Sequence, residues 1–195
     1  MHPVTMGGLT LKGVLEKVPQ LKPEQIDDII VGCAIPERKQ GFNMARLVAA
    51  RAGLPDSVCG MTINRFCSSG LQAIALAAGQ IACGVADVMV AGGVESMTSC
   101  PVNLDISDTF DPDLLLQREE EYLPMGLTAE NVAARYNVTR QEMDELAVES
   151  HRRAAAAQDA GKFDDEIIPL PGVDADGSEV FRHTYSPIDV ENENG

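Results

Sequence analysis

The sequence of 195 residues lacks the segments that direct proteins into or across membranes. No uninterrupted apolar run approaches the length that crosses a bilayer as a helix. The N-terminal stretch MHPVTMGGLTLKGVLEK has no basic region followed by an apolar block, so no secretory signal is predicted. Its glycines and its lack of arginine also fit a mitochondrial presequence poorly. We therefore expect a cytoplasmic protein.

Metal-binding and disulfide patterns are absent as well. The cysteines are odd in number and scattered, and none of them forms a CxxC pair. The histidines lie at no spacing typical of metal ligands, so neither a metal nor a bound cofactor is expected. Reduced thiols, as in a cytosolic protein, are the favoured interpretation. The residues concerned are Cys33, Cys59, Cys67, Cys83 and Cys100, with His2, His151 and His183.

Basic residues are too few for a nucleic-acid-binding protein. Fifteen lysines and arginines oppose thirty aspartates and glutamates, which gives a formal net charge of −15. Nucleic-acid binding requires a basic surface, so it is excluded as a function. An anionic ligand would need local arginines or helix N-termini to overcome the overall field.

The first half of the chain alternates between two hydrophobic periods, and this alternation predicts an α/β fold. Continuous apolar strands separated by helices indicate a parallel sheet covered on both faces. The helix that starts at Ser68 aligns Leu71, Ile74, Ala78 and Ile81, and we expect it to be buried. The predicted helices are 9–18, 43–53 and 68–84, and the predicted strands are 29–34, 60–66 and 87–93.

The second half of the sequence has a different character. Residues 99–122 are acidic and show no persistent period, which predicts an irregular segment. Thr139-Arg-Gln-Glu142 is a capping-box sequence that opens a long helix running to Gly161. EIIPL and SEVFRH, joined by a tight turn at DADG (174–177), predict a hairpin. The composition changes near Met97, so we expect two domains, 1–97 and 98–195.

Cys67 occupies the junction between a predicted strand and a predicted helix. The partial positive charge of a helix N-terminus favours a thiolate over a thiol, and the thiolate is the nucleophilic form. The small residues Ser68, Ser69 and Gly70 leave room for a large substrate to approach. The Cys67 N–H could also stabilise the oxyanion that forms when a carbonyl is attacked. A packed structural thiol is the alternative, but these surroundings favour acyl transfer.

Three long blocks of the sequence resemble the thiolase family. NRFCSSGLQAIALAAGQIACGVADVMVAGGVESMT is similar to the active-cysteine segment, and DDIIVGCAIPERKQGFNMARLVAARAGLP is similar to the stretch before it. MGLTAENVAARYNVTRQEMDELAVESHRRAAAAQDAGKFDDEIIPL resembles the loop domain of the family. VTMGG, GCAIPE, QGFN and NRFCSSGLQ are most similar to degradative 3-ketoacyl-CoA thiolases. The resemblance implies the N-terminal half of a layered αβαβα architecture with a partial α+β loop domain.

The resemblance also implies roles for two residues. Cys67 matches the cysteine that carries the acyl group in thiolases. Met125, in LPMGLTAEN, matches a position near the acyl and pantetheine pocket, although a core methionine is nearly as compatible with the sequence. Pro124 stands where acetoacetyl-CoA-specific members often have histidine, which favours the broader-chain degradative enzymes. The other four cysteines are interpreted as packing residues.

Several parts of the family pattern are absent from this sequence. The first strand with its ARTP-like segment is missing, and so are the NEAF segment, the GHP histidine and the second cysteine in a CxGGG run. None of the three histidines can take the missing role. We therefore expect an N-terminal portion of an acyltransferase that is incomplete for catalysis by itself.

The implied reaction is thiolytic cleavage of a 3-ketoacyl-CoA to acetyl-CoA and a shortened acyl-CoA, as in fatty acid β-oxidation, or the reverse Claisen condensation. CoA and acyl-CoA are then substrates. The resemblance further implies a homodimer or homotetramer and a possible partner in a fatty-acid oxidation multienzyme complex. Ketoacyl synthases share the fold and the nucleophile, but their DTACSSS-like segment differs from the asparagine and basic residue before Cys67. The alternative from another functional class is a binding module: a non-catalytic truncated paralogue that binds a thiolase subunit or CoA.

Overall fold

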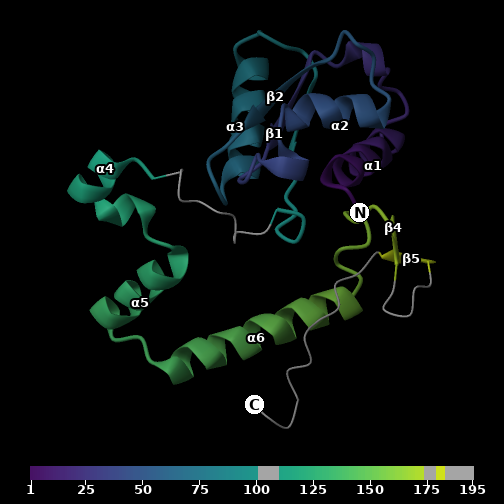
Figure 1. Cartoon of the computed structure of the whole chain (residues 1–195). Coiled ribbons are helices and arrows are strands. Elements are labelled where there is room, and N and C mark those ends of the chain that lie inside the picture. Colours follow the sequence, from purple (N-terminus) through teal and green to yellow (C-terminus); the bar gives the residue numbers. More distant parts are fainter. Residues whose placement is uncertain (101–109, 174–178, 183–195) are drawn as a thin grey trace. The chain divides into compact units, whose positions relative to one another are not determined.

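The computed structural model describes residues 1–100, 110–173 and 179–182. The described residues divide into two compact units, which Figure 1 colours along the sequence. The first unit lies within residues 1–102 and 168–183, and the second lies within residues 103–167 and 184–195. The domain boundary expected near Met97 stays a prediction.

A parallel sheet of three strands organises the first unit. Strand β1 (Asp28–Gly32) lies in the centre and pairs in parallel with β2 (Cys59–Ile63) on one side and β3 (Met89–Gly93) on the other. Ile29, Ile30 and Val31 of β1 are buried, as expected for a strand covered on both faces. The α/β class and the parallel sheet predicted from the sequence are confirmed.

Helices α1 (Pro3–Glu16) and α2 (Met44–Ala52) pack together beside the sheet and share one core with it. Ile29 and Val31 belong to this core, whereas Ile30 belongs to a second cluster, with Ala73 and Ala77. Asn43 caps the start of α2 by accepting the Arg46 N–H, and Gly53 ends it in the left-handed conformation with φ 83°. The predicted start and stop of this helix are confirmed.

Helix α3 (Ser69–Ala82) covers the other face of the sheet. Its buried residues are the small ones, Ser69, Ala73 and Ala77. The aligned apolar face expected to be buried is instead exposed: Leu71 is 71% exposed, Ile74 53% and Ile81 45%. That prediction was wrong because α3 is apolar on more than one face, and the sheet accepts the face whose small residues allow the closest approach.

Short connections complete the first unit. Two 3-10 helices, Pro23–Gln25 and Arg38–Gln40, precede and follow β1 along the sequence. The Asp27 carboxylate accepts the backbone N–H groups of Val88 and Asp87, which lowers its pKa below the usual value. These hydrogen bonds join the start of β1 to the residues that enter β3.

β4 (Leu170–Val173) and β5 (Glu179–Arg182) form an antiparallel pair. The predicted hairpin is therefore confirmed as a strand pair, although its first strand begins at Leu170 rather than at Glu166. The turn predicted at residues 174–177 lies outside the described residues.

The second unit is helical over its described residues. It contains α4 (Pro112–Gln117), a 3-10 helix (Glu119–Tyr122), α5 (Met125–Tyr136) and α6 (Arg140–Asp159). The irregular segment expected over residues 99–122 was thus wrong for its last part. Asp111 caps α4 by accepting the Leu114 N–H at 2.7 Å, and Pro112 occupies the first turn, where proline is tolerated.

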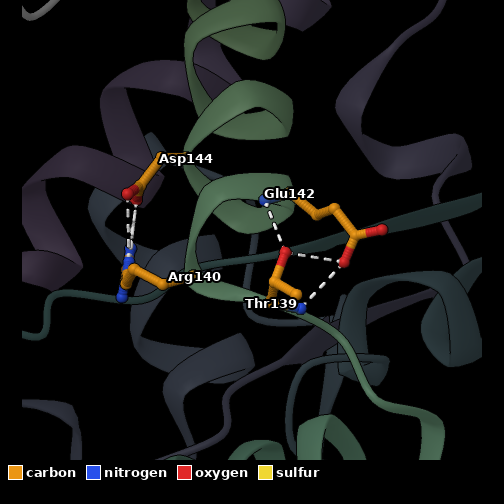
Figure 2. A network of polar contacts seen from close by, with 4 residues as sticks. All are labelled: Thr139, Arg140, Glu142 and Asp144. Carbon is orange, nitrogen blue, oxygen red and sulfur yellow. Dashed lines mark hydrogen bonds and ion pairs between the residues drawn. The ribbon is translucent and has the colours of Figure 1, made fainter.

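The capping box predicted at the start of α6 is present, as Figure 2 shows. The Thr139 hydroxyl accepts the Glu142 N–H at 3.2 Å, and the Glu142 carboxylate accepts the Thr139 N–H at 2.8 Å. These contacts hold the pKa of Glu142 below its usual value. Arg140 pairs with Asp144 one turn later. Across the described ranges, no helix is both long and apolar enough to span a bilayer.

Candidate functional site

Cys67 lies on a short junction between β2 and α3. Strand β2 ends at Ile63 and α3 begins at Ser69, so residues 64–68 turn the chain from the sheet into the helix. Ser68 is the N-cap residue of α3, and the Cys67 side chain is exposed. The strand-to-helix position predicted for this thiol is confirmed, and the thiol is open to a reagent.

The buried side chain of Ser69 stabilises the junction through hydrogen bonds. It is only 3% exposed, and its hydroxyl accepts the Arg65 N–H at 2.8 Å and donates to the Phe66 carbonyl at 2.6 Å. One side chain thus fixes two peptide groups immediately before Cys67. The sequence predicts only a small side chain at position 69, and its pattern does not indicate these two hydrogen bonds.

Phe66 adopts a left-handed backbone conformation with φ 46°. Bulky residues rarely occupy this region, because the Cβ atom approaches the backbone too closely. The Phe66 side chain is 74% exposed, so packing within the first unit does not account for the conformation. The local hydrogen bonds of the junction must hold it.

Glycines let α3 approach the sheet beneath Cys67. A Cβ atom added at Gly32, the last residue of β1, would lie 2.4 Å from the Ser69 carbonyl carbon and 2.6 Å from the Gly70 nitrogen. At Gly93, the last residue of β3, an added Cβ would lie 3.4 Å from the Gly70 Cα. Glycines at the ends of β1 and β3 contact the start of α3 closely. They therefore set the height of Cys67 above the sheet, that is, the distance between the sheet and the junction.

A polar cluster ties the loop after β1 to the loop after β3. The Glu95 carboxylate accepts the Ala34 N–H at 2.6 Å and the Gln40 side-chain N–H at 2.5 Å. Gln40 is fully buried, and its carbonyl oxygen accepts the Ser96 N–H at 2.5 Å. Both polar atoms of the Gln40 side chain therefore have partners, which makes this loop region well fixed.

The other cysteines differ from Cys67 in surroundings. Cys33 and Cys100 are buried, and the Cys100 thiol donates to the Glu37 carbonyl at 3.2 Å. Burial, followed by the charge of Glu95, raises the pKa of the Cys33 thiol to about 11. Cys59 and Cys83 are exposed, at the start of β2 and at the C-cap of α3 respectively.

Met125 begins α5 in the second unit and is 71% exposed. It lines an apolar groove of about 350 Å³ between α5 and α6, together with Val132, Val138 and Met143. Met125 and Cys67 belong to separate units of the structure. The substrate-binding role of Met125 stays a prediction. Within the described parts of the chain, no group of three or more His, Cys, Asp or Glu side chains is placed to hold a metal ion.

We expect Cys67 to alkylate faster than the other four cysteines at neutral pH. Cys83 is the internal reference, because it lies at the opposite end of the same helix, where the helix dipole opposes a negative charge. Cys33 should react slowest, since burial blocks access and its raised pKa keeps it a thiol.

A short iodoacetamide pulse followed by peptide mapping would rank the thiols, with a denatured sample as the control. Equal native rates for Cys67 and Cys83 would contradict a thiol activated by its position.

Comparison with known proteins assigns this chain to a family. Residues 1–189 match the model of the thiolase N-terminal domain. The chain is 45% identical to a 3-ketoacyl-CoA thiolase of Bacillus subtilis over 172 residues, which is 87% of this chain and 43% of that protein. It is 44% identical to an acetyl-CoA acetyltransferase of Cupriavidus necator over 177 residues, covering 85% of this chain and 44% of that protein.

The solved structures agree with the sequence comparisons. The crystal structure of the Bacillus anthracis acetyl-CoA acetyltransferase superposes with a TM-score of 0.80 at 35% identity, covering 97% of this chain and 50% of that one. The chain spans less than half of the length of the curated relatives named above. By its matched domain and its fold, the chain belongs to the thiolase family.

Proposed function

We propose that this chain supplies the nucleophile of a thiolase-type acyltransferase and that Cys67 is that nucleophile. The observation that carries the proposal is an exposed thiol on a tightly held strand-to-helix junction, in a chain that matches the thiolase N-terminal domain. A thiolate at this position forms covalent acyl intermediates readily.

In the proposed cleavage, the Cys67 sulfur attacks the 3-keto carbon of a 3-ketoacyl-CoA. The C2–C3 bond breaks, and its electron pair takes a proton at C2 to release acetyl-CoA. The shortened acyl group stays on Cys67 as a thioester until the thiol of a second CoA attacks it. Covalent catalysis divides a difficult carbon–carbon cleavage into two acyl transfers. The reverse sequence is a Claisen condensation.

The proposed substrates are CoA thioesters, and no further cofactor is required by this chemistry. Relatives named 3-ketoacyl-CoA thiolase and Pro124 before Met125 favour 3-ketoacyl-CoA cleavage, as in β-oxidation. Met125 is the proposed contact for the acyl or pantetheine chain, because it lines the apolar groove between α5 and α6.

Self-association is part of the proposal, as a homodimer or homotetramer. The exposed apolar residues Leu71, Ile74 and Ile81 on α3 support it, since contiguous apolar side chains on a surface usually mark an interaction site. A cytoplasmic location is proposed from the sequence, although one relative, from Arabidopsis thaliana, is named as peroxisomal. A partner in a fatty-acid oxidation complex remains a proposal from the family resemblance.

The activity is tested with the chain alone and in a chimera. Because the chain spans 43% of the Bacillus subtilis relative, the chimera joins it to the remaining length of that protein. We expect the chimera to cleave acetoacetyl-CoA in the presence of CoA, and the chain alone to show negligible turnover. A folded chimera that neither cleaves acetoacetyl-CoA nor becomes acylated at Cys67 would contradict the proposed function.

A further inference from the structure

The Asn64 side chain connects two segments that are far apart in the sequence. Its amide N–H donates to the Ala34 carbonyl at 3.1 Å, thirty residues earlier in the chain. Its carbonyl oxygen accepts the Phe66 N–H at 2.8 Å. Asn64 therefore joins the loop after β1 to the peptide group that directly precedes the left-handed residue before Cys67.

The Phe66 peptide needs such a restraint. A left-handed conformation in a bulky residue is unfavourable, and it persists only when surrounding contacts determine it. Two side chains supply these contacts: Ser69 accepts the Arg65 N–H, and Asn64 accepts the Phe66 N–H. The φ of 46° at Phe66 sets the direction of the backbone at the next residue, Cys67, and therefore the direction of its side chain.

The far end of the Asn64 contact is itself well anchored. Ala34 accepts the Asn64 amide through its carbonyl and donates its own N–H to Glu95 at 2.6 Å. Glu95 in turn accepts from Gln40, which is fully buried. A continuous series of hydrogen bonds thus runs from the buried loop through Asn64 to the peptide of Phe66.

We propose that Asn64 is the positioning residue that holds the Phe66 peptide in its left-handed conformation and so orients the Cys67 thiol. This role rests on the proposed function of Cys67 as an acyl acceptor. Asn64 acts through the backbone and is not itself a catalytic residue. Ser69 acts beside it, whereas the Asn64 side chain connects the junction to the loop after β1.

The test compares Asn64→Ala with Asn43→Ala. Asn43 is a matched control, because its side chain also accepts a backbone N–H, from Arg46 at 3.2 Å, and donates to a distant carbonyl, that of Gly60 at 2.7 Å. The carbonyl oxygen of the Asn43 side chain also accepts the Thr62 hydroxyl, so within the described residues its side-chain hydrogen bonds go to residues outside 64–68. Thermal unfolding establishes that both variants fold. Cys83 serves as the internal reference for the alkylation of Cys67.

In Asn64→Ala we expect hydrogen exchange of the Phe66 amide, measured by NMR, to become about tenfold faster. The alkylation rate of Cys67 relative to Cys83 should fall severalfold. Asn43→Ala should leave both values unchanged. In the double variant with Phe66→Gly, the relative alkylation rate should recover, because glycine adopts positive φ without steric cost. A purely structural role for Asn64 would not be rescued by glycine at position 66.

The proposal is overturned if Asn64→Ala leaves the Phe66 exchange rate and the Cys67 alkylation ratio unchanged. It is also overturned if Asn43→Ala changes them equally, or if Phe66→Gly gives no recovery. The Phe66 exchange measurement does not depend on acyl transfer. A folded chimera that neither cleaves acetoacetyl-CoA nor becomes acylated at Cys67 would therefore refute the proposed function, while this measurement still decides the role of Asn64.

Discussion

Replacing Cys67 by alanine should abolish acyl transfer to this chain. In the proposed exchange between Cys67 and an acyl-CoA, the acyl group would move to the cysteine sulfur and CoA would be released. Without the thiol, the hydroxyls of Ser68 and Ser69 remain on the junction, but each donates to a backbone carbonyl, and a hydroxyl without an adjacent base is a weak nucleophile. In the chimera with the Bacillus subtilis relative, turnover of acetoacetyl-CoA should fall roughly a thousandfold or more.

Mass spectrometry of digested protein measures the first effect, and release of acetyl-CoA measures the second. Cys83→Ala is the control, since Cys83 is equally a free exposed thiol but lies at the far end of α3. It should retain both activities. Acylation that persists at another cysteine in Cys67→Ala, at the wild-type rate, would remove Cys67 from its proposed role.

Features determined by a few neighbouring residues could be predicted from the sequence. The capping box at Thr139, the Asn43 cap and the left-handed Gly53 all depend on contacts within four residues. The apolar run of β1 predicted a mostly buried strand, because a strand covered on both faces is continuously apolar. The position of Cys67 between β2 and α3 followed from the same local patterns.

Contacts between distant segments could not be predicted in this way. The sequence shows that α3 is apolar, but only the sheet selects which face is buried, and it selects Ala73 and Ala77 rather than Leu71 and Ile74. The hydrogen bond from Asn64 to Ala34 spans thirty residues, and it leaves no periodic signal. The signal that could have indicated such a contact is the glycine at the end of β1, since glycine inside an apolar strand often marks a close backbone approach.

Gly32 is the position at which that approach is tightest. An added Cβ atom would meet backbone atoms of Ser69 and Gly70, which cannot rotate away as the end of a long side chain can. Gly32→Ala should therefore force the start of α3 away from the sheet. Overpacking of this kind typically costs about 1–3 kcal/mol.

The displacement should also change Cys67, because Ser69 holds both the helix start and the two peptides before the thiol. We expect Gly32→Ala to lower the urea midpoint of unfolding and to reduce the alkylation rate of Cys67 relative to Cys83. Gly92→Ala is the matched control: Gly92 lies next to Gly93 in β3, and an added Cβ there meets nothing within 4 Å. That variant should keep the Cys67 rate and unfold at an equal or higher urea concentration. If Gly32→Ala matches Gly92→Ala in both measurements, the start of α3 has room to move, and the height of Cys67 above the sheet is not set by glycine.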